Sequence, residues 1–240
     1  MVDPLHQFII KKIFDLKIFG VNIPFTNSSF FMILSIVLPI FFFLFFTKKS
    51  LLIPTRLQAI AESAYQFISD LVESNIGAEG KHYISLLLSV FIFVLFGNLL
   101  GMIPYAFTFT SHIIVTFTLA MVVFLIVIFV GFKHHGFHFF SVFFPEGAPK
   151  MMAPLLVPIE VLSFLSRPIS LSVRLFANMM AGHTILKVFA GFTVSLGVFG
   201  FAPLLINSAL MGLELLVACL QAYVFTILTC LYLKDAIHLH

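Results

Sequence analysis

The sequence predicts an all-α integral membrane protein: about three upright spans, a surface amphipathic helix, and a hairpin of two long, strongly tilted membrane helices. Of its 240 residues, 61% are hydrophobic and 10% are charged, and the mean hydropathy is +1.14. Long uncharged runs recur along the chain, and two apolar stretches are longer than one upright span needs. A water-soluble globule of this size cannot bury so much apolar surface, so the chain is expected to form a single membrane domain.

Apolar runs and their polar flanks set the expected boundaries of the first elements. Residues 1–29 carry lysines among Ile and Phe, a pattern typical of a segment that lies in the membrane interface. Uncharged runs predict upright spans at 30–46, 83–105 and 113–132, each near the length that crosses a hydrocarbon core of roughly 30 Å. Residues 56–76 place acidic side chains among apolar ones at helical spacing, which predicts an amphipathic surface helix.

The last two apolar stretches are too long to stand upright. Residues 151–192 would form a helix of ~63 Å and residues 202–233 one of ~48 Å, at ~1.5 Å per residue. No polar turn divides the first stretch before Gly191. The two stretches therefore predict two long helices, at 151–191 and 203–233, which form a tilted hairpin joined by a glycine-rich apolar turn.

Loop charges predict the orientation. With alternating spans, seven basic residues fall on one side and three on the other. By the positive-inside rule the side with seven, which includes the C-terminus, faces the cytoplasm or the mitochondrial matrix. The seven are Lys48, Lys49, Arg56, Lys81, Lys133, Lys150 and Lys234, and the three are Lys11, Lys12 and Lys17.

Arg174 lies inside the first long apolar stretch, where a guanidinium keeps its charge and is costly to desolvate. It is therefore a candidate for function. At 100° per residue, Glu160, Arg167 and Arg174 are seven apart and lie on nearly one helix face. Small and polar residues that let another helix approach closely share or flank this face. They are Ser163, Ser170, Asn178 and Ala181.

Other polar residues predict two polar routes that are separated by this cation. His183 follows Arg174 by nine residues and points to the opposite side of the helix. On the last helix, Glu214 and Gln221 are seven apart and share a face. We expect one route through His183 and Glu214 and another through Glu160, neither of which crosses the membrane alone. His112, at the outer end of the third span, is a further candidate for proton entry or a solvated surface histidine.

Three motifs resemble those of subunit a (subunit 6) of F-type ATP synthases. The strongest runs from Ser166 to His183, the second from Glu214 to Tyr223, and the third from Gly97 to Tyr105. Many bacterial members of that family have Glu and then His at the two positions that here hold His183 and Glu214. The exchanged order is similar to that of mitochondrial and alphaproteobacterial members.

The resemblance implies a proton-translocating stator subunit whose long helices lie against a rotating ring of c subunits, each with a membrane carboxylate. The chain has no catalytic chemistry alone and would be a subunit of the H⁺-transporting two-sector ATPase. The implied site residues are the essential arginine Arg174, its neighbours Asn178, Gln221 and Ser170, the entry half-channel residues His183, Glu214 and His112, and the exit half-channel residue Glu160.

The expected partners are the c-ring, the peripheral stalk, other membrane subunits, the lipid bilayer and protons. No nucleic acid, cofactor or metal is expected. The expected location is the mitochondrial inner membrane, with the bacterial inner membrane as the alternative. Other interpretations remain open: a structural ion pair of Arg174 with Glu160 or Glu214, a pair of Glu160 with Arg167, a simply buried His183, a proton-coupled transporter, or a structural subunit of a respiratory complex.

Overall fold

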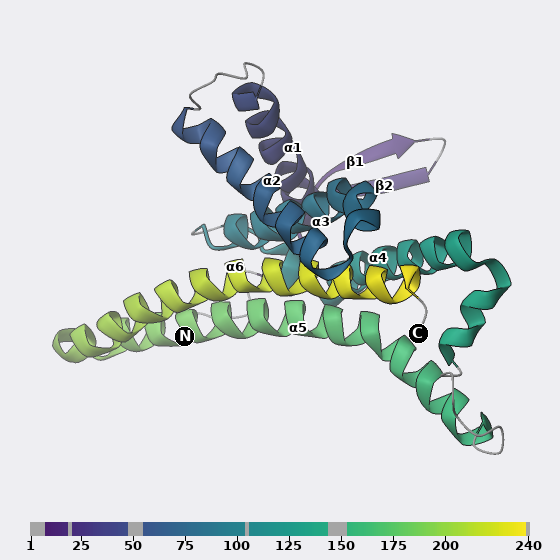
Figure 1. Ribbon diagram of the computed structural model, residues 1–240. Helices are drawn as coiled ribbons and strands as arrows, with labels where there is room; N and C mark the ends of the chain where they lie inside the picture. The colour runs from purple at the N-terminus through teal and green to yellow at the C-terminus, as the bar shows by residue number, and fades with distance from the viewer. Residues whose placement is uncertain (1–7, 19–20, 48–54, 104–105, 144–152, 239–240) are drawn as a thin grey trace.

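The computed structural model describes residues 8–18, 21–47, 55–103, 106–143 and 153–238, and it confirms the helical membrane class (Figure 1). Five of the described helices are long and apolar enough to cross a membrane. They are α1 (Asn27–Thr47), α3 (Ile84–Gly101), α4 (Ile113–His135), α5 (Ala153–Ser195) and α6 (Phe201–Ile237).

The N-terminal region contains a hairpin that the sequence did not predict. β1 (Lys12–Ile18) pairs antiparallel with β2 (Val21–Thr26), and α1 follows directly. The side chain of Asn27 joins the two parts, because its Oδ1 accepts from the backbone N–H groups of Lys11 at 3.1 Å and Ser28 at 2.9 Å. These two strands add to the helical class without changing it.

α2 (Arg56–Asn75) is the amphipathic helix of the fold. Thr55 caps its first turn by accepting from the backbone N–H of Gln58 at 3.4 Å. Ile68 and Val72 are fully buried, whereas the acidic residues of the helix are exposed. In Figure 1, α1 and α2 extend together away from the long pair α5 and α6.

α5 and α6 are the longest helices, with 43 and 37 residues, and they lie side by side along most of their lengths (Figure 1). A short 3₁₀ turn (Gly197–Gly200) joins them. The first part of α5 is inclined to the rest, and the helix contains Pro158 and Pro168, which remove backbone hydrogen bonds and favour bending.

Two adjacent apolar clusters hold the helices together. One joins α2, α3, α4 and the C-terminal half of α6 and includes Ile68, Leu87 and Leu233. The other joins α3, α4, α5 and α6 and includes Leu175 and Phe225. Because α3 and α4 pack against the middle of the α5–α6 pair, one side of that pair is fixed and buried.

Some sequence predictions fall outside the described residues. These are Lys48, Lys49, Lys150, the Pro104–Tyr105 end of the third motif, and the ends of two expected segments at 1–7 and 151–152.

Candidate functional site

Arg174 is exposed because the neighbouring side chains of α5 use a different face for packing. Leu171, Leu175 and Met179 are each at most 1% exposed and belong to the apolar cluster with α3, α4 and α6. Their spacing of four residues makes a continuous buried stripe. Arg174 forms no ion pair with any acidic residue in the described ranges. The structural ion pair with Glu160 or Glu214 is therefore not present.

The face around Arg174 is lined by small and polar groups. Ser170, Asn178 and Ala181 are exposed on the same side of α5. The amide of Asn178 donates to Oε1 of Gln221 on α6 at 2.9 Å, so one of the polar neighbours links the two long helices. Small side chains on an exposed membrane face allow another helix to approach closely.

His183 and Glu214 meet on another side of α5, between the long helices. They are 8% and 5% exposed, and Nδ1 of His183 lies 3.4 Å from Oε1 of Glu214. Gly182 makes this contact possible, since a Cβ there would lie 2.7 Å from Oε1 of Glu214. A buried imidazole and carboxyl group in contact can exchange a proton.

The connection between α3 and α4 contributes one polar contact to this pair and carries a further buried polar cluster. The buried Thr108 lies with Oγ1 3.1 Å from Nε2 of His183. His112 stacks on Phe107 with ring centroids 5.1 Å apart, and burial lowers the pKa of His112. Asn98 on α3 donates to the backbone oxygen of Ala218, one turn after Glu214, at 3.3 Å.

Several buried polar atoms of α3, α6 and the α3–α4 connection have no hydrogen-bond partner within the described part of the chain. Buried groups of this type usually bind water or exchange protons, because an unpaired polar atom is costly in an apolar environment. They are Asn98 Oδ1, Thr110 Oγ1, His112 Nε2, Asn207 Oδ1, both carboxylate oxygens of Glu214, and Gln221 Nε2.

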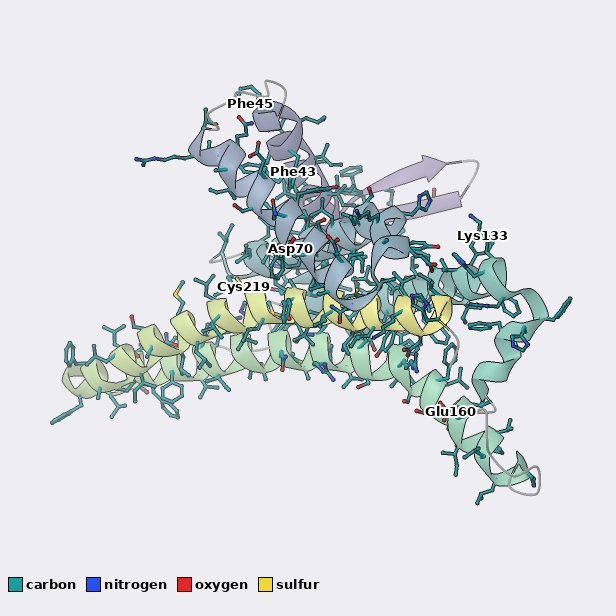
Figure 2. All side chains as sticks on the ribbon, viewed as in Figure 1. Phe43, Phe45, Asp70, Lys133, Glu160 and Cys219 are labelled. Carbon is teal, nitrogen blue, oxygen red and sulfur yellow. The ribbon has the colours of Figure 1, made fainter. Side chains whose placement is uncertain are left out.

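Glu160 is separated from that cluster. Figure 2 shows it on the inclined first part of α5, away from the packed middle of the molecule. It precedes Arg174 by ~21 Å and His183 by ~35 Å along the helix, at ~1.5 Å per residue. Glu160 and the pair of His183 and Glu214 therefore lie on opposite sides of Arg174 along α5.

The proposed pairing of Glu160 with Arg167 is wrong. Arg167 instead contacts Asp235 near the end of α6, with Nη1 and Oδ2 2.9 Å apart. Its guanidinium also lies over the rings of Phe164 and Tyr232, at 5.2 and 5.0 Å from their centroids. Arg167 reaches these partners because α5 packs beside the C-terminal end of α6 at Phe164, where the two helices share an apolar cluster.

Comparison with known proteins identifies the family. The family described as "ATP synthase A chain" matches residues 29–234, which is most of the sequence. The chain belongs to this family. It is 52% identical over 241 residues to "ATP synthase subunit a" of Rhodospirillum rubrum, with 100% of each chain covered. It is 53% identical over 243 residues to "ATP synthase subunit a" of Rhizobium etli (strain CIAT 652), covering 98% of this chain and 97% of the relative.

Family membership confirms the resemblance drawn from the three motifs. Members of the family are the proton-translocating stator subunits of F-type ATP synthases. Both relatives are bacterial, so the comparisons support a multi-pass protein of the bacterial inner membrane. They give no support to the mitochondrial inner membrane, the location expected first from the sequence.

Sequence reasoning missed three residues that the fold brings to the site. Thr108 contacts His183, Gly182 makes room for Glu214, and Asp235 holds Arg167. The polar run from Thr108 to His112 between two apolar spans was a signal for the first. The other two depend on which helices pack together.

Proposed function

We propose that this chain moves protons to and from a rotating ring of c subunits in the membrane sector of a bacterial F-type ATP synthase, with Arg174 between two half-channels. The observation that carries this proposal is the placement of Arg174. Its guanidinium is exposed beside small side chains and has no acidic partner among the described residues, whereas His183 and Glu214 pair elsewhere on α5. A cation left unpaired on such a face suits an acid on another subunit.

The entry half-channel runs through His183 and Glu214. An imidazole and a buried carboxyl group can gain and lose protons near neutral pH, and the unpartnered polar atoms around them suit a hydrated path. His112 and Asn98 line the approach to this pair. A proton that reaches Glu214 passes to a carboxylate of the ring, which then rotates through lipid in its neutral form.

Arg174 controls the step in which the ring carboxylate releases its proton. When a neutral ring acid approaches from lipid, the guanidinium favours the ionised carboxylate and drives release of the proton. The same charge repels protons, so it blocks direct flow between the half-channels. Arginine suits this task because it stays charged when desolvated, whereas lysine can become neutral. Ser170, Asn178 and Gln221 fix the polar surroundings of the guanidinium.

The exit half-channel runs past Glu160. This residue lies ~21 Å before Arg174 along α5, toward the opposite end from His183. Protons therefore enter and leave at different depths, and rotation of the ring is needed to connect the two paths. The membrane potential supplies about 2.3 kcal/mol per charge for each 100 mV.

The orientation and tilt of the helices belong to the same proposal. At 43 residues, α5 is about twice as long as a membrane core of roughly 30 Å requires, so a steep tilt keeps it within the bilayer. The positive-inside rule assigns the C-terminus to the cytoplasm. The peripheral stalk and other membrane subunits would hold the chain against the torque of the ring.

Replacement of Arg174 tests this function in the assembled ATP synthase. In inverted membrane vesicles, Arg174→Ala is expected to lower ATP-driven proton pumping at least about 100-fold, as loss of a preorganised charge does, and to raise the passive proton leak. Arg174→Lys is expected to lower pumping as well, because the amine can lose its charge. Arg56→Ala, which removes an exposed arginine from α2, serves as the control.

Each measurement can contradict the proposal. Normal pumping by Arg174→Ala in a fully assembled complex would exclude the assigned role. A chain that purifies without ring subunits and transports a solute alone would instead support a secondary transporter. Protease added to inverted vesicles is expected to remove a C-terminal epitope tag, and protection of the tag would reverse the orientation.

A further inference from the structure

Thr108 connects the α3–α4 link to the buried pair of His183 and Glu214. Its side chain is only 3% exposed. Oγ1 donates to the backbone oxygen of Gly101 at 3.2 Å and lies 3.1 Å from Nε2 of His183. Both contacts are buried, and the second joins residues that are 75 positions apart in the sequence.

Counting protons shows which form of His183 fits both contacts. A threonine hydroxyl has one proton and can accept through its lone pairs, whereas a backbone carbonyl can only accept. The proton that Thr108 donates to Gly101 is therefore not available to His183. Thr108 must accept from the imidazole, which requires a hydrogen on Nε2. In the neutral ring, Nδ1 then carries the lone pair.

Nδ1 is also the atom that faces Glu214, at 3.4 Å from Oε1. We propose that Thr108 is a positioning residue that holds His183 as the Nε2–H tautomer, so that Nδ1 exchanges protons with Glu214. This inference rests on the proposed function of the pair as the entry half-channel. When Glu214 is protonated, its O–H bond breaks as an N–H bond forms at Nδ1, which leaves a carboxylate and an imidazolium. The reverse step returns the proton to Glu214.

The opposite tautomer would stop this exchange. A hydrogen on Nδ1 would leave no lone pair there to accept the proton of a neutral Glu214. It would also place the bare Nε2 opposite a hydroxyl oxygen whose only proton is already donated. The hydrogen bond that Nε2–H of His183 donates to Thr108 thus sets which end of the imidazole can act as the base, in the same way that second partners orient other histidines.

The backbone around Thr108 fixes the position of its hydroxyl. Gly101 lies so close that a Cβ there would be 2.6 Å from Cγ2 of Thr108. The hydroxyl of Ser111 donates to the backbone oxygen of Thr108 at 2.6 Å. The hydroxyl is therefore held between α3 and α5 rather than free to turn away.

Two substitutions at Thr108 separate the hydroxyl from the shape of the side chain. Thr108→Val keeps the volume and removes the hydrogen bonds, and Thr108→Ser keeps the hydroxyl. Thr116→Val is the matched control, because this buried threonine donates only to the backbone of its own helix, at Ile113. In Thr108→Val the ratio of the two tautomers of His183 is expected to shift about tenfold, the factor that one hydrogen bond of ordinary strength contributes to an equilibrium. ATP synthesis driven by a proton gradient is expected to fall with the population of the Nε2–H form. Thr108→Ser and Thr116→Val are expected to stay within about twofold of the parent.

The tautomer can be measured directly in the assembled complex. Nitrogen-15 NMR of complex labelled at histidine distinguishes a protonated from a bare ring nitrogen, and comparison with His183→Asn identifies the signal of His183. We expect hydrogen on Nε2 in the parent and in Thr108→Ser, and a mixture of tautomers in Thr108→Val.

The two proposals fail in different ways. A hydrogen on Nδ1 in the parent complex would overturn the role of Thr108 without any variant, and so would a Thr108→Val complex that keeps both tautomer and rate. Neither result would affect the loss of pumping expected for Arg174→Ala. Normal pumping in Arg174→Ala would instead remove the half-channel function on which the role of Thr108 depends.

Discussion

Gly182 shows how a single position controls the geometry of the site. α5 and α6 approach each other so closely there that the carboxylate of Glu214 occupies the space a side chain would need. His183 follows Gly182 directly, so the same close approach brings the imidazole to Glu214. A glycine inside a long helix is less favourable than alanine by about 1 kcal/mol. The contact between His183 and Glu214 nevertheless requires glycine at position 182, because a larger residue would leave no space for the carboxylate.

Gly182→Ala is expected to push Glu214 away from α5 and to lower proton-driven ATP synthesis. Overpacking of a filled site costs roughly 1–3 kcal/mol, so a fall of at least about fivefold is expected. Gly191→Ala and Gly212→Ala are matched controls in α5 and α6, because a Cβ at either position meets nothing within 4 Å. Rates of ATP synthesis in membrane vesicles provide the measurement. Equal rates for all three variants would show that the contact at Gly182 does not limit the reaction.

At the level of helices, the ion pair of Arg167 and Asp235 joins α5 to the end of α6, just after the inclined segment of α5. The ion pair is 2.9 Å long, and the aromatic rings of Phe164 and Tyr232 cover the guanidinium. Cation–π contacts of this type add to the attraction of the carboxylate. Arg167 lies between Glu160 and Arg174 in the sequence, so the ion pair fixes the direction in which α5 carries Glu160 away from Arg174.

Asp235→Asn is expected to weaken this connection by about 1 kcal/mol, since the carboxylate is 40% exposed and partly screened. The measurement is retention of the chain in the solubilised membrane sector during titration with denaturant. The control is Asp15→Asn, which breaks an exposed pair of Lys12 and Asp15 on the hairpin. The double variant Arg167→Asp with Asp235→Arg is expected to restore part of the loss. Identical retention of Asp235→Asn and the control would contradict the role of the pair.

Helix positions could be predicted from the sequence because burial in lipid is a local property. The surface helix was expected at 56–76 and α2 spans Arg56–Asn75, and the third span was expected from 113 and α4 begins at Ile113. Glycine and proline were less informative about helix ends. α5 continues through Gly191 to Ser195, because glycine is tolerated inside a long helix that packs against a neighbour.

The hairpin and the partners of the site residues could not be read from local pattern. Lysines among apolar residues at 12–18 are typical of an interfacial segment, but this pattern does not specify helix or strand. These residues are extended because β1 pairs with β2. The sequence predicts that Arg174 and His183 lie on opposite sides of one helix. The structure agrees, because Arg174 is exposed and His183 is buried. It could not supply Thr108 or Asp235, since both contacts join segments more than 60 positions apart.

At the level of the whole molecule, the fold separates a packed side from an open side. α3 and α4 cover one side of the α5–α6 pair and bury His183 and Glu214 there. The side of α5 with Arg174 stays exposed and carries small residues on both sides of the guanidinium. A subunit that must meet a moving partner needs this division, because the packed side keeps the site in shape while the open side makes contact.

Disulfide formation with the c-ring tests most directly whether this open side faces the rotor. A cysteine is placed beside the membrane carboxylate of each c subunit, and Ser170→Cys or Ala181→Cys is placed on the Arg174 face of α5. Ile169→Cys is the control, since it is 53% exposed but lies about 140° around the helix from Arg174. We predict rapid cross-linking of the first two variants and little of the control. Preferential cross-linking through Ile169→Cys, or none through Ser170→Cys and Ala181→Cys in an assembled complex, would contradict the placement of Arg174 against the ring.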